Sequence, residues 1–301
     1  MPDFICIGGQ RTGTTWLHHV LSSNQTVWMP PCKELHHFDT LSPDVTAYPY
    51  RYREHLGSRL RHYGLAAARL VRRDLRPDVA VRLDWDWDLR YFLQPGRSID
   101  WYRGLFQTRA AQGKVTGEIT PAYSLLPQGE VQAIADALPK AKIILILREP
   151  LSRAWSHALK DLPAEAANDT DRMVSFLRDP ECFERSNWPE IIGRWQSAFP
   201  ADQILILDFD QIKAAPDAFL AKVATFLGTD LALPESREVG GSLRERGSSS
   251  YRAGGIPAEV KEAVADLYAP VIQKTAEMLP DIAGGWLDRQ SELLDRATTS
   301  A

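Results

Sequence analysis

A glycine- and threonine-rich segment near the N-terminus has the composition of a loop that binds phosphate or sulfate. It follows a short aliphatic run, Phe4–Gly8, and leads into the next predicted helix. Glycines let the backbone N–H groups of such a loop converge on an anion, and the start of the helix adds the positive end of its dipole. Hydroxyl groups and one guanidinium add further donors. We expect the anion to be bound by Arg11, Thr12, Gly13, Thr14, Thr15 and Trp16.

The loop differs from an ATP-binding loop at one position. Gly8 and Gly13 have the spacing of a Walker A motif, and Thr15 occupies its Ser/Thr position. The lysine that reaches the β- and γ-phosphates of ATP is replaced by Thr14, and the positive charge lies within the loop at Arg11. This pattern favours a nucleoside bisphosphate over ATP with magnesium.

A second set of anion-binding residues follows the central aliphatic run, Ile143–Leu147. Pro150 is expected to end this strand and to begin a helix. Arg148 then lies at the strand end and Ser156 on the helix face, so both can contact one phosphate group. Two anion sites at neighbouring strand ends suit a 3′,5′-bisphosphate, whereas ATP does not require them.

The elements that position these residues alternate between strands and helices, which is typical of an α/β fold with a central parallel sheet. From about residue 40 to 98 the alternation stops, and a segment rich in Arg, Tyr and Trp predicts an inserted, mainly helical cap on a single domain of residues 1–301. A long helix is expected from about Pro257 and another near Trp286–Arg296. The expected strands are Phe4–Gly8, Lys114–Gly117, Lys142–Leu147 and Gln203–Leu207.

Composition excludes several classes of protein. The chain has 301 residues, 44% of them hydrophobic, and a net charge of −4, which excludes a disordered or fibrous protein and a general nucleic-acid binder. Cys6, Cys32 and Cys182 are odd in number and widely spaced, so neither a disulfide framework nor a zinc site is expected. No aliphatic run approaches the roughly 18 apolar residues of a membrane span. We expect a soluble, cytoplasmic protein without a metal.

The two anion motifs together resemble those of the sulfotransferases that use 3′-phosphoadenosine 5′-phosphosulfate (PAPS) and release PAP, especially the heparan sulfate, Golgi-type and bacterial members. The resemblance implies a P-loop-NTPase-like fold. The cytosolic members have Lys-x-Gly-Thr-Thr-Trp in the loop that binds the 5′-phosphosulfate, and Arg11–Trp16 differs by Arg in place of Lys. Arg keeps its charge but is a poorer proton donor. Trp16 either stacks on a base or packs in the core. The resemblance assigns Arg148 and Ser156 to the 3′-phosphate.

The segment from Lys33 to Asp39 resembles the Glu-x-His-Phe-Phe-Asp segment of the Golgi-type enzymes, in which the Glu is the general base. An acceptor hydroxyl must lose its proton as it attacks sulfur, and a carboxylate within hydrogen-bond reach accepts it. We therefore expect Glu34 to be the base and His36 to orient the acceptor or the base, with His37 structural. The cytosolic branch uses a histidine further along the chain, which stays an alternative.

Two more segments extend the resemblance. Gly117–Tyr123 resembles Glu-Lys-Thr-Pro-Ala-Tyr of the heparan enzymes, but Ile119 replaces the Lys that contacts the sugar there, which argues against a glycosaminoglycan acceptor. Related enzymes close a basic, Gly-containing loop over the 3′-phosphate near the C-terminus. Arg246 and Arg252 are both candidates for this contact.

The insertion has an unusual composition of its own. Eight arginines lie between positions 51 and 76, where they form either the solvated face of a helix or a surface for an acidic acceptor or partner. Trp85–Asp88 and Tyr91 either line an aromatic acceptor pocket or attach the cap to the core.

The sequence therefore predicts a PAPS-dependent sulfotransferase that acts on a hydroxyl group of a small molecule, with a sugar or a peptide tyrosine less favoured. Transfer is expected to be in line, with Glu34, Arg11 and His36 as the catalytic residues. One alternative is a P-loop kinase or NTPase with Asp208 or Asp210 as the metal-binding carboxylate. Another is a nucleotide-binding regulator without turnover.

Overall fold

The structure is a computed structural model that describes residues 1–40, 47–72, 84–93, 98–234 and 255–287. Five parallel strands form one sheet in the order β2-β3-β1-β4-β5, which confirms the predicted α/β class. β1 lies at the centre, and the chain continues to one side of it through β2 and β3 and to the other through β4 and β5. Ligands of such sheets bind at the carboxyl ends of the strands, where the order reverses. The strands are β1 (Phe4–Gly8), β2 (Val27–Trp28), β3 (Val115–Ile119), β4 (Lys142–Leu147) and β5 (Ile204–Asp208).

The central strands are buried on both faces, since successive side chains point to opposite sides of a strand. Ile5 and Ile143 lie in the core on one face, together with side chains of α5 and α9. Cys6 and Ile144 lie in the core on the other face, together with α1 and α11. This two-sided burial explains the nearly continuous aliphatic runs that predicted these strands. The four helices are α1 (Thr14–Ser23), α5 (Gln128–Ala137), α9 (Trp188–Gln196) and α11 (Pro216–Leu227).

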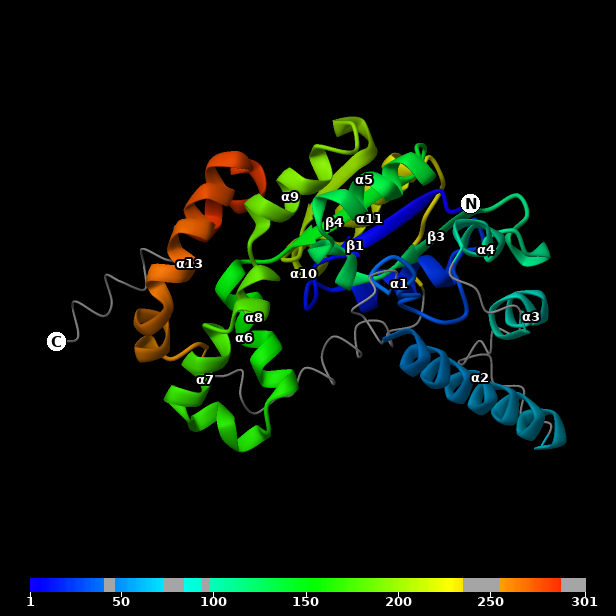
Figure 1. Ribbon diagram of the computed structural model, residues 1–301, viewed down its shortest axis with the longest axis horizontal. Helices are drawn as coiled ribbons and strands as arrows, with labels where there is room; N and C mark the ends of the chain where they lie inside the picture. Colours follow the sequence, from blue (N-terminus) through cyan, green and yellow to red (C-terminus); the bar gives the residue numbers. More distant parts are fainter. Residues whose placement is uncertain (41–46, 73–83, 94–97, 235–254, 288–301) are drawn as a thin grey trace.

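A third apolar cluster joins α6, α7 and α8 to the C-terminal helix α13. α13 lies at one end of the molecule and α2 (Ala47–Arg72) at the other, with the sheet between them (Figure 1). α13 follows Pro257 as predicted, and a further helical stretch covers residues 280–287, beginning before the predicted start at Trp286. The remaining helices are α4 (Ile99–Gly104), α6 (Pro150–Asp161), α7 (Thr170–Leu177), α8 (Pro180–Glu184), α10 (Gln211–Ala214) and α13 (Ala258–Met278), with 3-10 turns at η1 (Arg109–Ala111), η2 (Pro121–Leu125), η3 (Ala164–Asn168) and η4 (Ala201–Gln203).

The insertion contributes the helices α2 (Ala47–Arg72) and α3 (Trp85–Leu93), which run antiparallel. Nε and Nη2 of Arg59 each lie 2.7 Å from a carboxylate oxygen of Asp88, and both residues are buried. Arg59 is therefore an exception to both interpretations of the arginine-rich run, whereas Arg53 and Arg61 are exposed, as either interpretation requires. Arg73 and Arg76 lie outside the described residues.

Trp87 and Tyr91 of α3 are completely buried in the main core. Of the two interpretations of this aromatic segment, attachment of the insertion to the core is therefore the one that the packing supports. Among the described residues, no helix is long and apolar enough to cross a membrane. The organisation of residues 1–301 as one domain stays a prediction.

Candidate functional site

The loop between β1 and α1 is tightly packed at its glycines. A Cβ atom on Gly9 would lie 2.5 Å from the Trp188 ring, and one on Gly13 would lie 2.5 Å from Ile212. Gly13 has φ +85° and precedes the first residue of α1. Arg11 has φ +67° without being glycine, a strained conformation that is enriched at functional sites. The loop thus adopts a curled path that its sequence predicted, next to a helix start with no acidic residue in its first turn.

The side chains of the loop differ in their exposure. The hydroxyl of Thr12 is buried and donates to the carbonyl oxygen of Gly9 at 2.6 Å, so it stabilises the loop itself. Thr14 is buried, whereas Thr15 is exposed at the start of the helix. Trp16 is 5% exposed, and its ring packs edge-on against Phe219 at 5.6 Å. Of the two interpretations of Trp16, this contact supports packing in the core, and its contact with a cofactor stays a prediction.

The two predicted anion sites lie side by side. Nε of Arg11 donates to the carbonyl oxygen of Ser156 at 3.1 Å and to its Oγ at 3.2 Å. Nη1 of Arg148 donates to the carbonyl oxygen of Arg11 at 3.2 Å. The guanidinium of Arg148 also lies over the ring of Phe209, 4.7 Å from its centre. The carboxylate of Glu149 caps α6 by accepting from two backbone amides at 2.9 and 2.6 Å. The loop, the end of β4 and helix α6 therefore bring two guanidinium groups and a hydroxyl to one edge of the sheet.

The segment after β2 brings a carboxylate close to this loop. Nζ of Lys33 lies 2.9 Å from Oε1 of Glu34 and donates to Oγ1 of Thr15 at 3.3 Å. The ring of His36 lies between two carboxylates, with Nε2 3.5 Å from Oε2 of Glu34 and Nδ1 2.5 Å from Oδ2 of Asp39. Glu34 and His36 have φ +62° and +52°. Strained backbone thus occurs again in the residues predicted to be catalytic.

Glu34 is held in its charged form. Its partial burial alone would raise its pKa, but the hydrogen bonds and charges of His36 and Lys33 lower the pKa to about 2. The carboxylate is therefore ionised over the physiological pH range and able to accept a proton. With so low a pKa, the Glu34 carboxylate is a weak base. A general base works best when its pKa is near the operating pH.

A buried carboxylate, Glu118, belongs to a hydrogen-bonded cluster that contacts the backbone of this segment. Glu118, at the end of β3, is 1% exposed and accepts hydrogen bonds from Tyr102 at 2.5 Å and Tyr123 at 3.2 Å. Burial raises the pKa of Glu118, and its hydrogen bonds, including one from Thr120, act in the opposite direction. The backbone N–H of His37 donates to the Tyr123 hydroxyl at 2.8 Å, and the His37 ring stacks on Tyr102. This cluster anchors the backbone that carries Glu34.

Comparison with known proteins agrees with this geometry. Residues 2–232 match the family model described as the sulfotransferase family. The chain belongs to the sulfotransferase family. Its relatives include human bifunctional heparan sulfate N-deacetylase/N-sulfotransferase 3, 31% identical over 148 residues, which cover 44% of this chain and 17% of that protein. Human bifunctional heparan sulfate N-deacetylase/N-sulfotransferase 2 is 24% identical over 247 residues, covering 76% of this chain and 22% of that protein. The chain thus spans about a fifth of the length of these curated relatives.

A solved sulfotransferase from Alicyclobacillus acidocaldarius shares the fold, with a TM-score of 0.55 and 20% sequence identity. The similarity covers 93% of this chain and 96% of that one. It supports the all-parallel sheet and the flanking helices described above, and the prediction of a sulfotransferase fold is confirmed.

Several residues of this sulfotransferase site were not predicted from the sequence. Lys33 directly precedes Glu34 in the sequence, and this position was the available indication that Lys33 belongs to the site. Asp39 and Glu118 belong to motifs that the sequence analysis singled out, but spacing alone does not reveal the contact of Asp39 with His36 or those of Glu118 with two buried tyrosines. Arg246 and Arg252 lie outside the described residues. In the described part of the sulfotransferase chain, no group of His, Cys, Asp and Glu is arranged to hold a metal.

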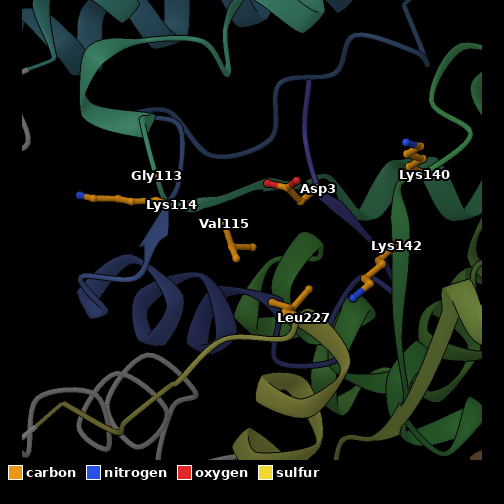
Figure 2. Close-up of a pocket in the computed structure, with 7 residues that line it drawn as sticks. All are labelled: Asp3, Gly113, Lys114, Val115, Lys140, Lys142 and Leu227. Atoms are coloured by element: carbon orange, nitrogen blue, oxygen red, sulfur yellow. The ribbon is translucent and has the colours of Figure 1, made fainter.

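A cavity of about 290 Å³ lies elsewhere in the sulfotransferase fold. It is lined at the amino ends of the strands by Asp3, Val115 and Lys142, among others, which is the edge of the sheet opposite the loop. Figure 2 shows that the side chain of Lys114 points away from Asp3 and Val115. This cavity is therefore separate from the candidate site.

Proposed function

We propose that this sulfotransferase moves the sulfuryl group of PAPS to a hydroxyl group of a small molecule and releases PAP. The observation that carries the proposal is the direct link between the anion-binding loop and a carboxylate. Lys33 contacts both Thr15 of the loop and Glu34. A donor site and a proton acceptor at this distance are what transfer to a hydroxyl group requires.

The residues at the loop fit the two charged ends of PAPS. The curled loop, the start of α1 and Arg11 offer amides and a cation to the 5′-phosphosulfate. Arg148 and Ser156 are the proposed contacts of the 3′-phosphate. Their proximity to Arg11 supports this assignment, since one nucleotide then contacts both sets of residues.

Each residue has a proposed role in the reaction. When bound, PAPS supplies the sulfuryl group, whose bond to the 5′-phosphate oxygen breaks as the acceptor oxygen bonds to sulfur. Glu34 accepts the proton of the acceptor hydroxyl. Arg11 and the loop amides offset the negative charge at the donor side, a contribution of about 10²–10³ in rate for one well-placed donor. His36, supported by Asp39, orients the Glu34 carboxylate.

The acceptor is proposed to be a small molecule, with a sugar or a peptide tyrosine less favoured. The position that holds Lys in the heparan sulfate enzymes is Ile119 here, and its side chain is 1% exposed in the core beside α1. A side chain in this position packs the sheet and does not reach an acceptor. This supports an acceptor other than a glycosaminoglycan.

Calorimetry tests the proposal by comparing PAP with ADP and magnesium. We expect PAP to bind more tightly, and tighter binding of ADP with magnesium would refute the proposal in favour of a kinase or NTPase. Arg148→Ala should weaken PAP but leave adenosine 5′-phosphosulfate, which lacks the 3′-phosphate, nearly unchanged. An equal loss for both ligands would contradict the assigned 3′-phosphate site.

Turnover is tested with PAPS and a panel of hydroxyl acceptors, including p-nitrophenol, monosaccharides and a tyrosine peptide. Transfer to a small hydroxyl compound is the expected result. Tight PAP binding with no transfer to any acceptor would indicate a nucleotide-binding regulator instead.

A further inference from the structure

Lys33 adds an ammonium group to the two guanidinium groups at the anion-binding loop. Thr14 occupies the position of the Walker lysine, and Arg11, the cation of the loop, is hydrogen-bonded to Ser156 on α6. Lys33 reaches the loop from the segment that follows β2. Its Nζ lies 3.3 Å from Oγ1 of Thr15, the exposed threonine at the start of α1. The loop is thus accompanied by an ammonium at Thr15 as well as by the guanidinium groups of Arg11 and Arg148.

The same ammonium is the closest cation to the proposed base. It lies 2.9 Å from Oε1 of Glu34, and the two side chains are 22% and 30% exposed, so this ion pair is only partly shielded from water. A lysine ammonium has three donors on a flexible stem and can exchange one partner for another without losing its charge. Lys33 can therefore contact Thr15, Glu34 and a bound anion in turn.

We propose that Lys33 contacts the transferred sulfuryl group and that it releases Glu34 when the donor binds. This inference rests on the proposed function. The donor adds negative charge beside Thr15, which competes with Glu34 for the ammonium. Lys33 keeps its proton throughout, the acceptor proton goes to Glu34, and the electron pair of the broken S–O bond stays on the 5′-phosphate.

The exchange links the strength of the base to the presence of the donor. In the free protein, Lys33 contributes to the low pKa of Glu34 through both its charge and its hydrogen bond. Loss of this contact removes two of the influences that keep Glu34 weakly basic. Glu34 then becomes a better proton acceptor only when the sulfuryl group is in place. Removal of the acceptor proton is thereby linked to binding of the donor.

The test compares two nucleotides that differ by the sulfuryl group. Lys33→Met removes the charge and keeps the length of the side chain. Calorimetry without acceptor should show PAPS binding weakened about tenfold or more, the size expected for one charge-assisted hydrogen bond, with PAP changed by less than about twofold. Lys33→Arg should restore most of the PAPS affinity. The matched control is Lys114→Met, an exposed lysine at the opposite edge of the sheet, which should bind both nucleotides like the wild type.

A second measurement does not depend on any ligand. NMR titration of the Glu34 carboxyl carbon should show a higher pKa in Lys33→Met than in the wild type. An equal loss of PAP and PAPS affinity, an unchanged PAPS affinity, or an unchanged Glu34 titration would overturn the inference. Lys33→Gln carries the same predictions if the methionine variant does not fold. If the wild type fails to prefer PAP over ADP with magnesium, the proposed function itself fails. If the wild type binds PAPS and the Lys33→Met variant binds it equally tightly, only the role of Lys33 is refuted.

Discussion

The Tyr123 hydroxyl offers a way to disturb the proposed base without touching it. It donates to Glu118 at 3.2 Å and accepts from the backbone N–H of His37 at 2.8 Å, and Tyr123 is completely buried. Tyr123→Phe keeps the ring and removes one oxygen. The N–H of His37 then loses this buried partner, so the backbone that carries Glu34 loses one of its attachments to β3.

The cost follows from the burial of these groups. A buried donor that loses its partner costs about 1–3 kcal/mol. For a chain of 301 residues, an unfolding entropy of about 2.1 cal/mol/K per residue converts this cost into a fall in Tm of about 2–5 °C. If the whole cost falls on the geometry of the Glu34 segment, kcat decreases by at most about 5- to 150-fold. PAP affinity should stay the same, because the loop and α6 do not contact Tyr123 through any of the hydrogen bonds described.

The assay combines thermal unfolding, PAP calorimetry and the rate of sulfuryl transfer. Tyr52→Phe is the matched control, since it also removes one hydroxyl, which donates to the carbonyl oxygen of Phe92 at 2.9 Å in the insertion. The control should lose stability without the same loss of kcat. A Tyr123→Phe variant with lower Tm and unchanged kcat would refute the view that Glu118 and Tyr123 position the base. A parallel loss of PAP affinity would instead indicate that the disturbance spreads to the donor loop.

Three further variants test other parts of the structure. Glu34→Gln should retain PAP binding and reduce transfer by about 10²-fold or more, as loss of the general base requires, and full activity in a steady-state assay would move the base to a histidine. Asp88→Ala leaves the buried charge of Arg59 without its carboxylate and should destabilise α2 and α3 by about 3–5 kcal/mol, which faster proteolysis of the insertion would reveal. Asp86→Ala removes the partner of a half-exposed ion pair and should change the proteolysis rate little. Burial and the nearby charge of Arg153 lower the pKa of His157 to about 4, below its ordinary 6.5. As pH falls, His157 therefore takes up a proton in the unfolded chain before it does so in the folded protein. The free energy of unfolding consequently decreases as pH falls from 6.5 to 4. His157→Gln should make urea unfolding less dependent on pH in that window, and an equal pH dependence would contradict this.

The sheet was largely predictable from the sequence because its central strands are buried on both faces. Lys142–Leu147 is a strand over the same residues as predicted, and the strand predicted at Gln203–Leu207 is shifted by one residue. β2 was missed because two residues, Val27 and Trp28, are too short to produce a periodic pattern. Strand prediction thus succeeded where burial dictates composition and failed where pairing with a neighbour alone defines the strand.

The candidate site was predictable only in part. The loop and Arg148 could be placed because strand ends in a parallel sheet meet at one edge, and composition then gives their chemistry. Two interpretations of Trp16 stayed open because its position in a helix does not reveal which face of α1 meets Phe219. The contact between Lys33 and Thr15 joins residues 18 apart through a non-regular segment, and no periodicity describes such a segment.

The proposed donor site reconciles a net charge of −4 with the binding of an anion that has two charged ends. Arg11 lies in the loop that follows β1, Arg148 directly follows the adjacent strand β4, and a hydrogen bond from Arg148 to the carbonyl oxygen of Arg11 links the two. Two cations held at a fixed separation favour a ligand whose two anionic groups have a matching separation over a ligand with a single anionic group. Both contacts then form without rearrangement of the protein. Lys33 differs in this respect, since it is carried by the segment after β2 and is paired with Glu34. In the proposed function, the two linked arginines are therefore suited to binding the nucleotide, and the lysine is suited to responding to it.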